Sequence, residues 1–236
     1  VFAGTFYAAN QPDVMENTWR NYVHGRQLIN FLNPFRQRNI LDTEYLIDIF
    51  RGSTSYLDVD RALASQVALS YSAEHYPTGN LVYLQPDRER IFDMMRAATA
   101  LPFLHAPVKM GSETYIDAGF VDPLPFQKAL ADGHTDITVI YNKSPGFYVG
   151  RGYQLFGTLF SLLLTPTIGA QARALNSKYK TIERSLADTK HIRIIRPSIP
   201  ITMSITNTNQ KNLHQLFDLG VHDAKEYLRA TLSYPH

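Results

Sequence analysis

The most informative part of the chain is the run Tyr115-Ile116-Asp117-Ala118-Gly119-Phe120-Val121-Asp122-Pro123-Leu124-Pro125. Its first two residues predict a short strand, which delivers Asp117 at its carboxyl end, where α/β sheets usually present their functional groups. We expect Gly119 to allow a tight turn with positive φ. Local chemistry leaves two interpretations of Asp117 open: a carboxylate that caps backbone amides after a strand, or a catalytic group.

Outward from this run, the spacing of apolar residues predicts helices that alternate with short strands, which indicates the α/β class. Asp42 or Thr43 is expected to cap the third helix, and Gly52 to end it. The nearly continuous apolar run 137–141 favours a strand of a parallel sheet that is covered on both faces. The predicted helices are 1–9, 14–23, 41–50, 88–99, 126–131, 153–188 (broken at Pro166) and 213–232, and the predicted strands are 67–71 and 81–84 (a hairpin-like pair), 115–116, 137–141 and 192–195.

Length and composition indicate a globular protein. The chain has 236 residues, of which 44% are hydrophobic, and we expect one domain over residues 1–236, with 146–236 as a looser helical C-terminal region. The net charge of +2 offers no electrostatic footprint for nucleic acid. Because the chain has no cysteine, disulfides and thiolate zinc sites are excluded. The longest apolar stretch, 155–164, is far shorter than the roughly 20 residues that span a bilayer.

Other motifs that carry chemistry are missing or incomplete. The eight histidines show no His-Glu-x-x-His spacing, so we predict neither a metal nor a cofactor. Gly150 and Gly152 open like a dinucleotide fingerprint, but position 155 is leucine. The chain also holds no complete Gly-x-Ser-x-Gly elbow, since only Gly146 and Gly150 are four residues apart and a tyrosine lies between them. A serine-hydrolase interpretation must therefore place its nucleophile outside these residues, or else the nucleophile is missing.

Residues 154–164 predict a widely apolar helix with two open interpretations. An ordinary helix that is apolar all round is buried in the core. The alternative is a lid or interfacial helix, although basic residues on its polar face are scarce.

Four blocks in order resemble the patatin-like phospholipases. The 115–125 run is similar to the family's Asp-Gly-Gly/Ala block, with Ala118 in place of the commoner glycine. The opening Val1–Pro12 is similar to the helix that follows the family's nucleophile elbow. Two further blocks carry the resemblance, Ala97–Leu104 (the Ala-Ser-x-Ala-x-Pro loop) and Asn39–Ile47 (a helix of bacterial members).

The resemblance implies a three-layer α/β/α fold related to the α/β-hydrolases, N-terminally incomplete, and a lipid acyl hydrolase with a Ser–Asp dyad. Asp117 falls on the proton acceptor, within the motif Asp117, Ala118 and Gly119, and the serine is expected just upstream of Val1. It also implies a lipid or acyl-ester substrate, a peripheral membrane contact, and a location in the cytoplasm or at a membrane. The alternative is a non-catalytic lipid- or protein-binding module of the same fold.

Overall fold

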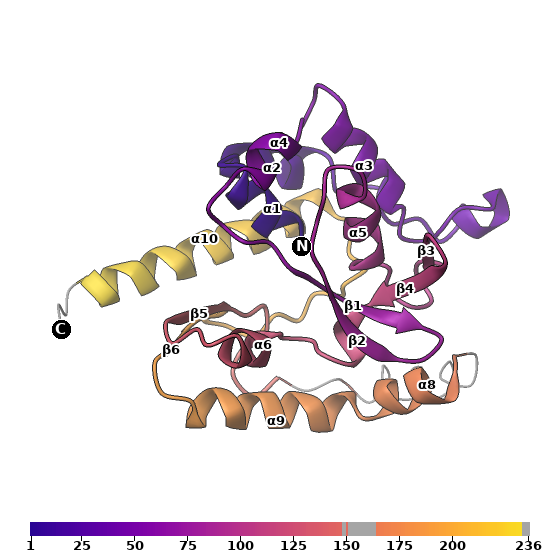
Figure 1. Cartoon of the computed structure of the whole chain (residues 1–236). Coiled ribbons are helices and arrows are strands. Elements are labelled where there is room, and N and C mark those ends of the chain that lie inside the picture. The colour runs from indigo at the N-terminus through magenta and orange to yellow at the C-terminus, as the bar shows by residue number, and fades with distance from the viewer. Residues whose placement is uncertain (148–149, 151–163, 233–236) are drawn as a thin grey trace. The chain divides into compact units, whose positions relative to one another are not determined.

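The structure is a computed structural model, and it describes residues 1–147, 150 and 164–232. These residues form two compact units (Figure 1): unit 1 holds Val1–Asp122 and Thr206–Leu213, and unit 2 holds Pro123–Ile205 and His214–His236. A single domain over residues 1–236 stays a prediction. In the described part of the chain, no helix is both long and apolar enough to cross a membrane.

Unit 1 is built on a four-stranded sheet in the order β2-β1-β4-β3, in which every neighbouring pair is antiparallel. Helix α5 packs on the sheet, and α1 and α3 share its apolar core. The strands are β1 (Tyr71–Tyr76), β2 (Asn80–Leu84), β3 (Val108–Met110) and β4 (Glu113–Asp117), and the helices are α1 (Phe2–Ala8), α2 (Pro12–Asn21), α3 (Thr43–Arg51), α4 (Val59–Leu63) and α5 (Ile91–Ala97), with 3₁₀ turns η1 (Asn33–Arg36) and η2 (Ala118–Phe120).

The predicted hairpin exists, but its first strand was placed too early. β1 begins at Tyr71, where the predicted strand 67–71 ended, and it pairs with β2 from Tyr71↔Leu84 to His75↔Asn80. The apolar residues before Tyr71 gave a strand signal, whereas β1 itself is rich in polar residues. The three-residue β3 was not predicted at all, because so short a strand carries no periodic pattern.

Helix α3 shows how local sequence and core packing agree. The Asp42 carboxylate accepts the Tyr45 N–H at 3.3 Å, which confirms the predicted N-cap. The helix ends at Gly52, as predicted, but with a φ of −84°. Its buried Phe50 meets the ring of Phe6 edge-on, with 5.0 Å between ring centroids. This contact places α1 against α3 in the core of unit 1.

Unit 2 contains a two-stranded parallel sheet, in which Ile137 pairs with Ile192 and Ile140 with Ile195. The prediction that 137–141 is covered on both faces is wrong, because Ile140 is 80% exposed while Ile137 and Val139 are buried. The side chains of β5 therefore alternate between core and surface. The elements are α6 (Phe126–Ala131), β5 (Ile137–Ile140), α8 (Pro166–Arg173), α9 (Leu175–Asp188), β6 (Ile192–Ile195) and α10 (Gln210–Leu232), the last of which begins in unit 1.

The break predicted at Pro166 is confirmed, since α8 starts at this residue. The core of unit 2 joins Phe126 of α6 and Leu186 of α9 to the buried side chains of β5. The apolar segment 154–164 lies outside the described residues except for Leu164, so its two interpretations stay open.

A chain of hydrogen bonds fixes the start of α1 to the sheet. The Thr5 hydroxyl donates to the Val1 carbonyl at 3.0 Å, so it accepts from the Tyr71 hydroxyl, 2.6 Å away. Thr5 and Tyr71 are both buried, and an unmade bond here would leave a desolvated polar group.

Replacing Tyr71→Phe should lower the free energy of unfolding by about 1 kcal/mol, because it removes one buried hydrogen bond and leaves the Thr5 oxygen short of a donor. Urea unfolding measures the change. Tyr56→Phe, at a half-exposed side chain, is the control. Equal destabilisation by the two variants would contradict the role given to Tyr71.

His105 ties the loop after α5 to α3. Its Nδ1–H donates to the Ala106 carbonyl at 2.5 Å, so Nε2 accepts from the Thr43 hydroxyl at 2.8 Å. Burial lowers the pKa of His105, which favours the neutral ring that this geometry requires.

The stability that His105 contributes should be complete above its unfolded pKa, about 6.5, and be lost as the pH falls below that value. We expect His105→Gln to flatten the decline of Tm between neutral and mildly acidic pH. Thermal melts of wild type and variant over this range measure the slope, with exposed His222→Gln as the control. Parallel pH profiles for wild type and His105→Gln would contradict this prediction.

Candidate active site

Asp117 is the last residue of β4, and it stands directly opposite Ala73 on β1. Residues that face each other across a strand pair share one side of the sheet. Asp117 therefore lies on the same side as Tyr71, two residues before Ala73, which is the side where Tyr71 holds α1. The prediction that a short strand ends at Asp117 is confirmed.

The backbone around Asp117 closes into a compact turn. Its Oδ1 accepts the Gly119 N–H at 2.6 Å, and its own N–H donates to the Ala100 carbonyl at 3.1 Å. The Asp122 N–H closes the turn onto the Ala118 carbonyl at 2.7 Å, and the Asp122 carboxylate accepts the Tyr83 hydroxyl at 2.9 Å. One hydrogen bond thus orients the Asp117 carboxylate, and the others fix the backbone before and after it.

Gly119 matters for a different reason from the one predicted. Its φ is not positive, so the expected left-handed turn is wrong. A Cβ at this position would instead lie 2.7 Å from Asp117 Oδ1, closer than such atoms approach. Glycine is therefore needed here so that the carboxylate can reach the backbone N–H. Ala118 also avoids a positive φ, and its methyl group is buried without backbone strain.

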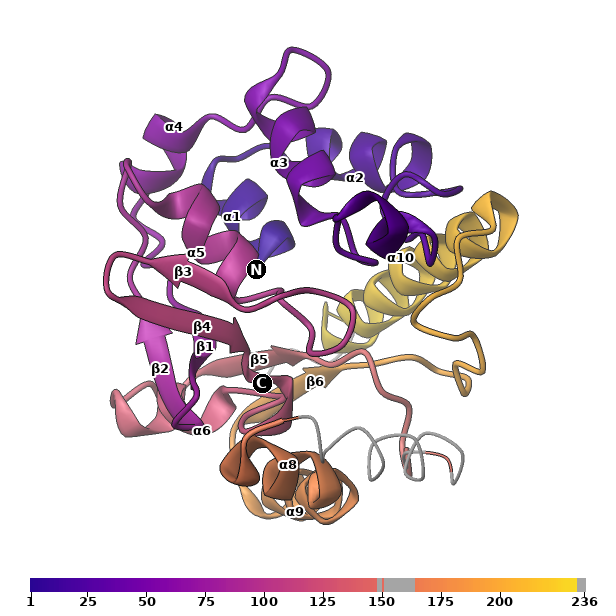
Figure 2. The ribbon, with the colours of Figure 1, turned by 90° about the vertical axis from the view of Figure 1, so that its right-hand side faces the viewer.

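The start of α1 comes close to the Asp117 carboxylate. The Val1 nitrogen is largely buried, and it lies near enough to this carboxylate for the two groups to interact. Figure 2 shows the N-terminus beside α5, on the side of the sheet that α5 covers. Any group bonded to the Val1 nitrogen would thus lie beside the carboxylate.

Burial raises the pKa of Asp117. A weaker effect, the hydrogen bond from the Gly119 N–H, lowers this pKa. Asp117 nevertheless retains some solvent exposure. A desolvated carboxylate that can still be reached is a stronger base than one in water, which suits proton transfer.

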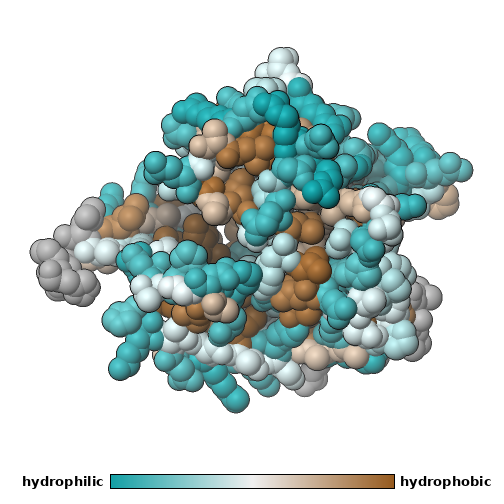
Figure 3. All heavy atoms as spheres, in the orientation of Figure 1, coloured by the Kyte–Doolittle hydropathy of each residue, from teal (hydrophilic) through white to brown (hydrophobic). Residues whose placement is uncertain are grey.

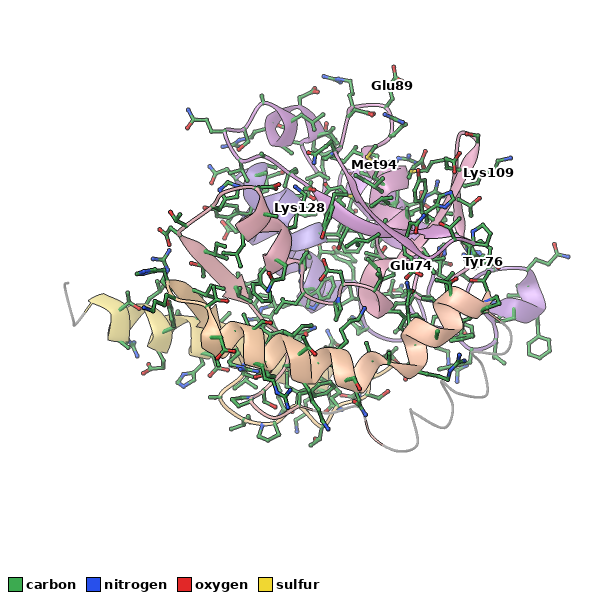
Figure 4. All side chains as sticks on the ribbon, turned by 60° about the horizontal axis from the view of Figure 1, so that its bottom comes forward. Glu74, Tyr76, Glu89, Met94, Lys109 and Lys128 are labelled. Atoms are coloured by element: carbon green, nitrogen blue, oxygen red, sulfur yellow. The ribbon has the colours of Figure 1, made fainter. Side chains whose placement is uncertain are left out.

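Two other ionisable groups on β1 were not singled out by the sequence. His75 shares the side of Asp117, but it pairs with Glu113 through Nε2 and bonds Thr78 through Nδ1 at 2.8 Å. Glu74 is fully buried and, by strand alternation, lies with Tyr76 on the opposite side of the sheet (Figure 4). Neither side chain joins Asp117. The register of β1 against β4 would have shown which side of the sheet His75 and Glu74 occupy. The sequence alone did not show where β1 begins, so this register could not be predicted.

Within the described residues, no three His, Asp or Glu side chains are grouped so as to hold a metal ion. The site is therefore described by one carboxylate, its backbone donor at Gly119 and the adjacent start of α1.

Comparison with known proteins places this geometry in a family. The family model of patatin-like phospholipases matches residues 3–130, more than half of the chain, from α1 through Asp117 into α6. Among curated proteins, none matches the chain. The chain therefore belongs to the patatin-like phospholipase family, a family of lipid acyl hydrolases with an α/β fold.

Proposed function

We propose that this protein hydrolyses acyl esters of lipids with a Ser–Asp dyad in which Asp117 is the general base. The observation that carries the proposal is the partly buried Asp117 carboxylate, which the Gly119 N–H holds at 2.6 Å on the side of the sheet where α1 lies. The serine would come from a Gly-x-Ser-x-Gly segment ahead of Val1, with oxyanion donors from a Gly-rich segment before it. The domain would then be the three-layer α/β/α sandwich related to the α/β-hydrolases.

The proposed reaction needs one carboxylate that takes up and releases a proton twice, once in each half of the reaction. The serine O–H passes its proton to Asp117 while the serine oxygen bonds to the ester carbonyl carbon. Asp117 then gives this proton to the departing alkoxide, which leaves an acyl-enzyme. A water molecule repeats the sequence, and the fatty acid leaves with both partners restored.

The contacts of Asp117 suit this role. Oδ1 is occupied by the Gly119 N–H, while Oδ2 accepts no hydrogen bond from the described residues. The hydrogen bond sets the direction of the carboxylate, and the second oxygen remains to take a proton. Because no histidine contacts Asp117 among these residues, the proposal requires no relay between serine and carboxylate.

Asp117→Asn in the full-length protein should reduce kcat on a short p-nitrophenyl ester by about 10²–10⁴-fold, the usual cost of losing base catalysis. The asparagine oxygen can still accept the Gly119 N–H, so the turn should persist. Exposed Asp13→Asn is the control. A kcat within about threefold of wild type would overturn the proposal and favour a non-catalytic lipid- or protein-binding module.

Gly119→Ala tests the positioning of the base. The new Cβ should push the carboxylate away from its N–H and lower kcat by about tenfold or more, since catalysis is sensitive to displacements of about 1 Å. The clash involves only the end of a side chain, so Tm should change little. Gly220→Ala, with open space around it, is the matched control. Wild-type kcat in a folded Gly119→Ala protein would show that the close approach is not required.

A further inference from the structure

Residues 30–40 form a loop whose base is closed by backbone hydrogen bonds. The Asn30 N–H donates to the Ile40 carbonyl at 2.9 Å, and the Asp42 N–H donates to the Leu28 carbonyl at 2.8 Å. Between them, Ile29 and Leu41 form an antiparallel bridge. Below, these residues are called the 30–40 loop; its short coil η1 stands out at the right-hand edge of unit 1 in Figure 1.

The interior of the loop is also fixed. Asn33 is buried and its side-chain amide donates to the Asn39 carbonyl at 2.9 Å, while the Arg38 N–H donates to the Asn33 carbonyl at 3.1 Å. The Asn39 side chain accepts the Ala106 N–H at 2.9 Å. The side chains of Asn33 and Asn39 thus hold the shape of the loop.

The large apolar side chains of the loop point outward instead. Phe35 is 88% exposed and Phe31 60%, and Leu32 is half-exposed. Figure 3 shows apolar atoms beside hydrophilic ones at this edge of the molecule. Two exposed phenylalanines on a loop of fixed shape add no stability in water, and such apolar patches mark surfaces that contact a partner or a membrane.

The charge around these side chains is positive. Residues 17–41 contain four arginines and neither aspartate nor glutamate. Arg36 and Arg38 follow Phe35 on the same loop and both are exposed, although Arg38 also lies 3.6 Å from the Asp42 carboxylate at the loop base. Aromatic and aliphatic side chains surrounded by arginine match a membrane interface with anionic headgroups.

We propose that the 30–40 loop docks the protein on an anionic lipid surface. Phe31, Leu32 and Phe35 enter between the headgroups, and Arg36 and Arg38 contact the lipid phosphates. The proposal rests on the proposed function, since it supplies the surface on which a lipid hydrolase meets its substrate. A projecting loop with three apolar tips suits insertion into lipid better than a protein interface, which needs about 800 Å² on each partner.

The loop is connected to the candidate site through one segment. The Leu41 N–H at the loop base donates to the Leu104 carbonyl at 2.8 Å, and four residues earlier the Ala100 carbonyl accepts the Asp117 N–H. The segment 100–104 therefore forms hydrogen bonds both with the base of the 30–40 loop and with the backbone of Asp117. Docking at the loop would hold Asp117 at a set place relative to the lipid surface.

The test is co-sedimentation of the full-length protein with vesicles of phosphatidylcholine, alone and mixed with phosphatidylserine. The double variant Phe31→Ser/Phe35→Ser should weaken binding to the mixed vesicles by about tenfold or more. Arg36→Gln and Arg38→Gln should each cost about fivefold on mixed vesicles and little on phosphatidylcholine alone. Ile205→Ser is the matched control, since Ile205 is 59% exposed, close to the 60% of Phe31.

Wild-type vesicle binding by the Phe31→Ser/Phe35→Ser variant would overturn the inference. So would a change of oligomeric state in that variant, measured by light scattering, with vesicle binding unchanged, which would assign the loop to contact with a second copy. The two proposals fail separately: Asp117→Asn should bind vesicles as wild type does, and the phenylalanine variant should hydrolyse a soluble ester normally. Full activity of Asp117→Asn would remove the dyad but leave the docking result in place.

Discussion

The antiparallel pairing of β1 with β4 is the constraint on which the candidate site depends. Its register sets Asp117 against Ala73 and thereby on the side of the sheet where Tyr71 holds Thr5. A slip by one residue would turn Asp117 to the side of Glu74 and away from α1. The hairpin between β1 and β2 and the core under α5 secure that register, so the position of one carboxylate is a property of the whole unit.

The Asp117 carboxylate lowers the stability of the unit that positions it. A carboxylate with a raised pKa is destabilising when it is charged, because only one neutral N–H replaces the water it has lost. Other groups of unit 1 offset this cost without contacting the Asp117 carboxylate. The Tyr71–Thr5 pair and the neutral His105 satisfy buried polar atoms of unit 1, and the rings of Phe6 and Phe50 pack in its core.

Much of this arrangement could be read from the sequence, and the rest fails for identifiable reasons. The cap at Asp42 and the strand that ends at Asp117 follow from local side-chain chemistry, so they could be predicted. β1 could not be delimited, because its stability comes from pairing on both edges and not from an apolar pattern. Gly119 was predicted to be needed for a positive φ, but it is needed because the Asp117 side chain approaches it closely. Such a contact cannot be recognised from the conformational preference of glycine.

The closed base of the 30–40 loop has an evolutionary consequence. Because the bond between Asn30 and Ile40 and the bridge between Ile29 and Leu41 close the loop at its base, its exposed residues can change while the frame stays in place. A descendant of this protein could exchange Phe35 for a polar residue and leave the sheet unaltered. The preference for a lipid surface could then change through replacements at the tip of the loop. The catalytic chemistry would stay constrained by the position of Asp117 at the end of β4.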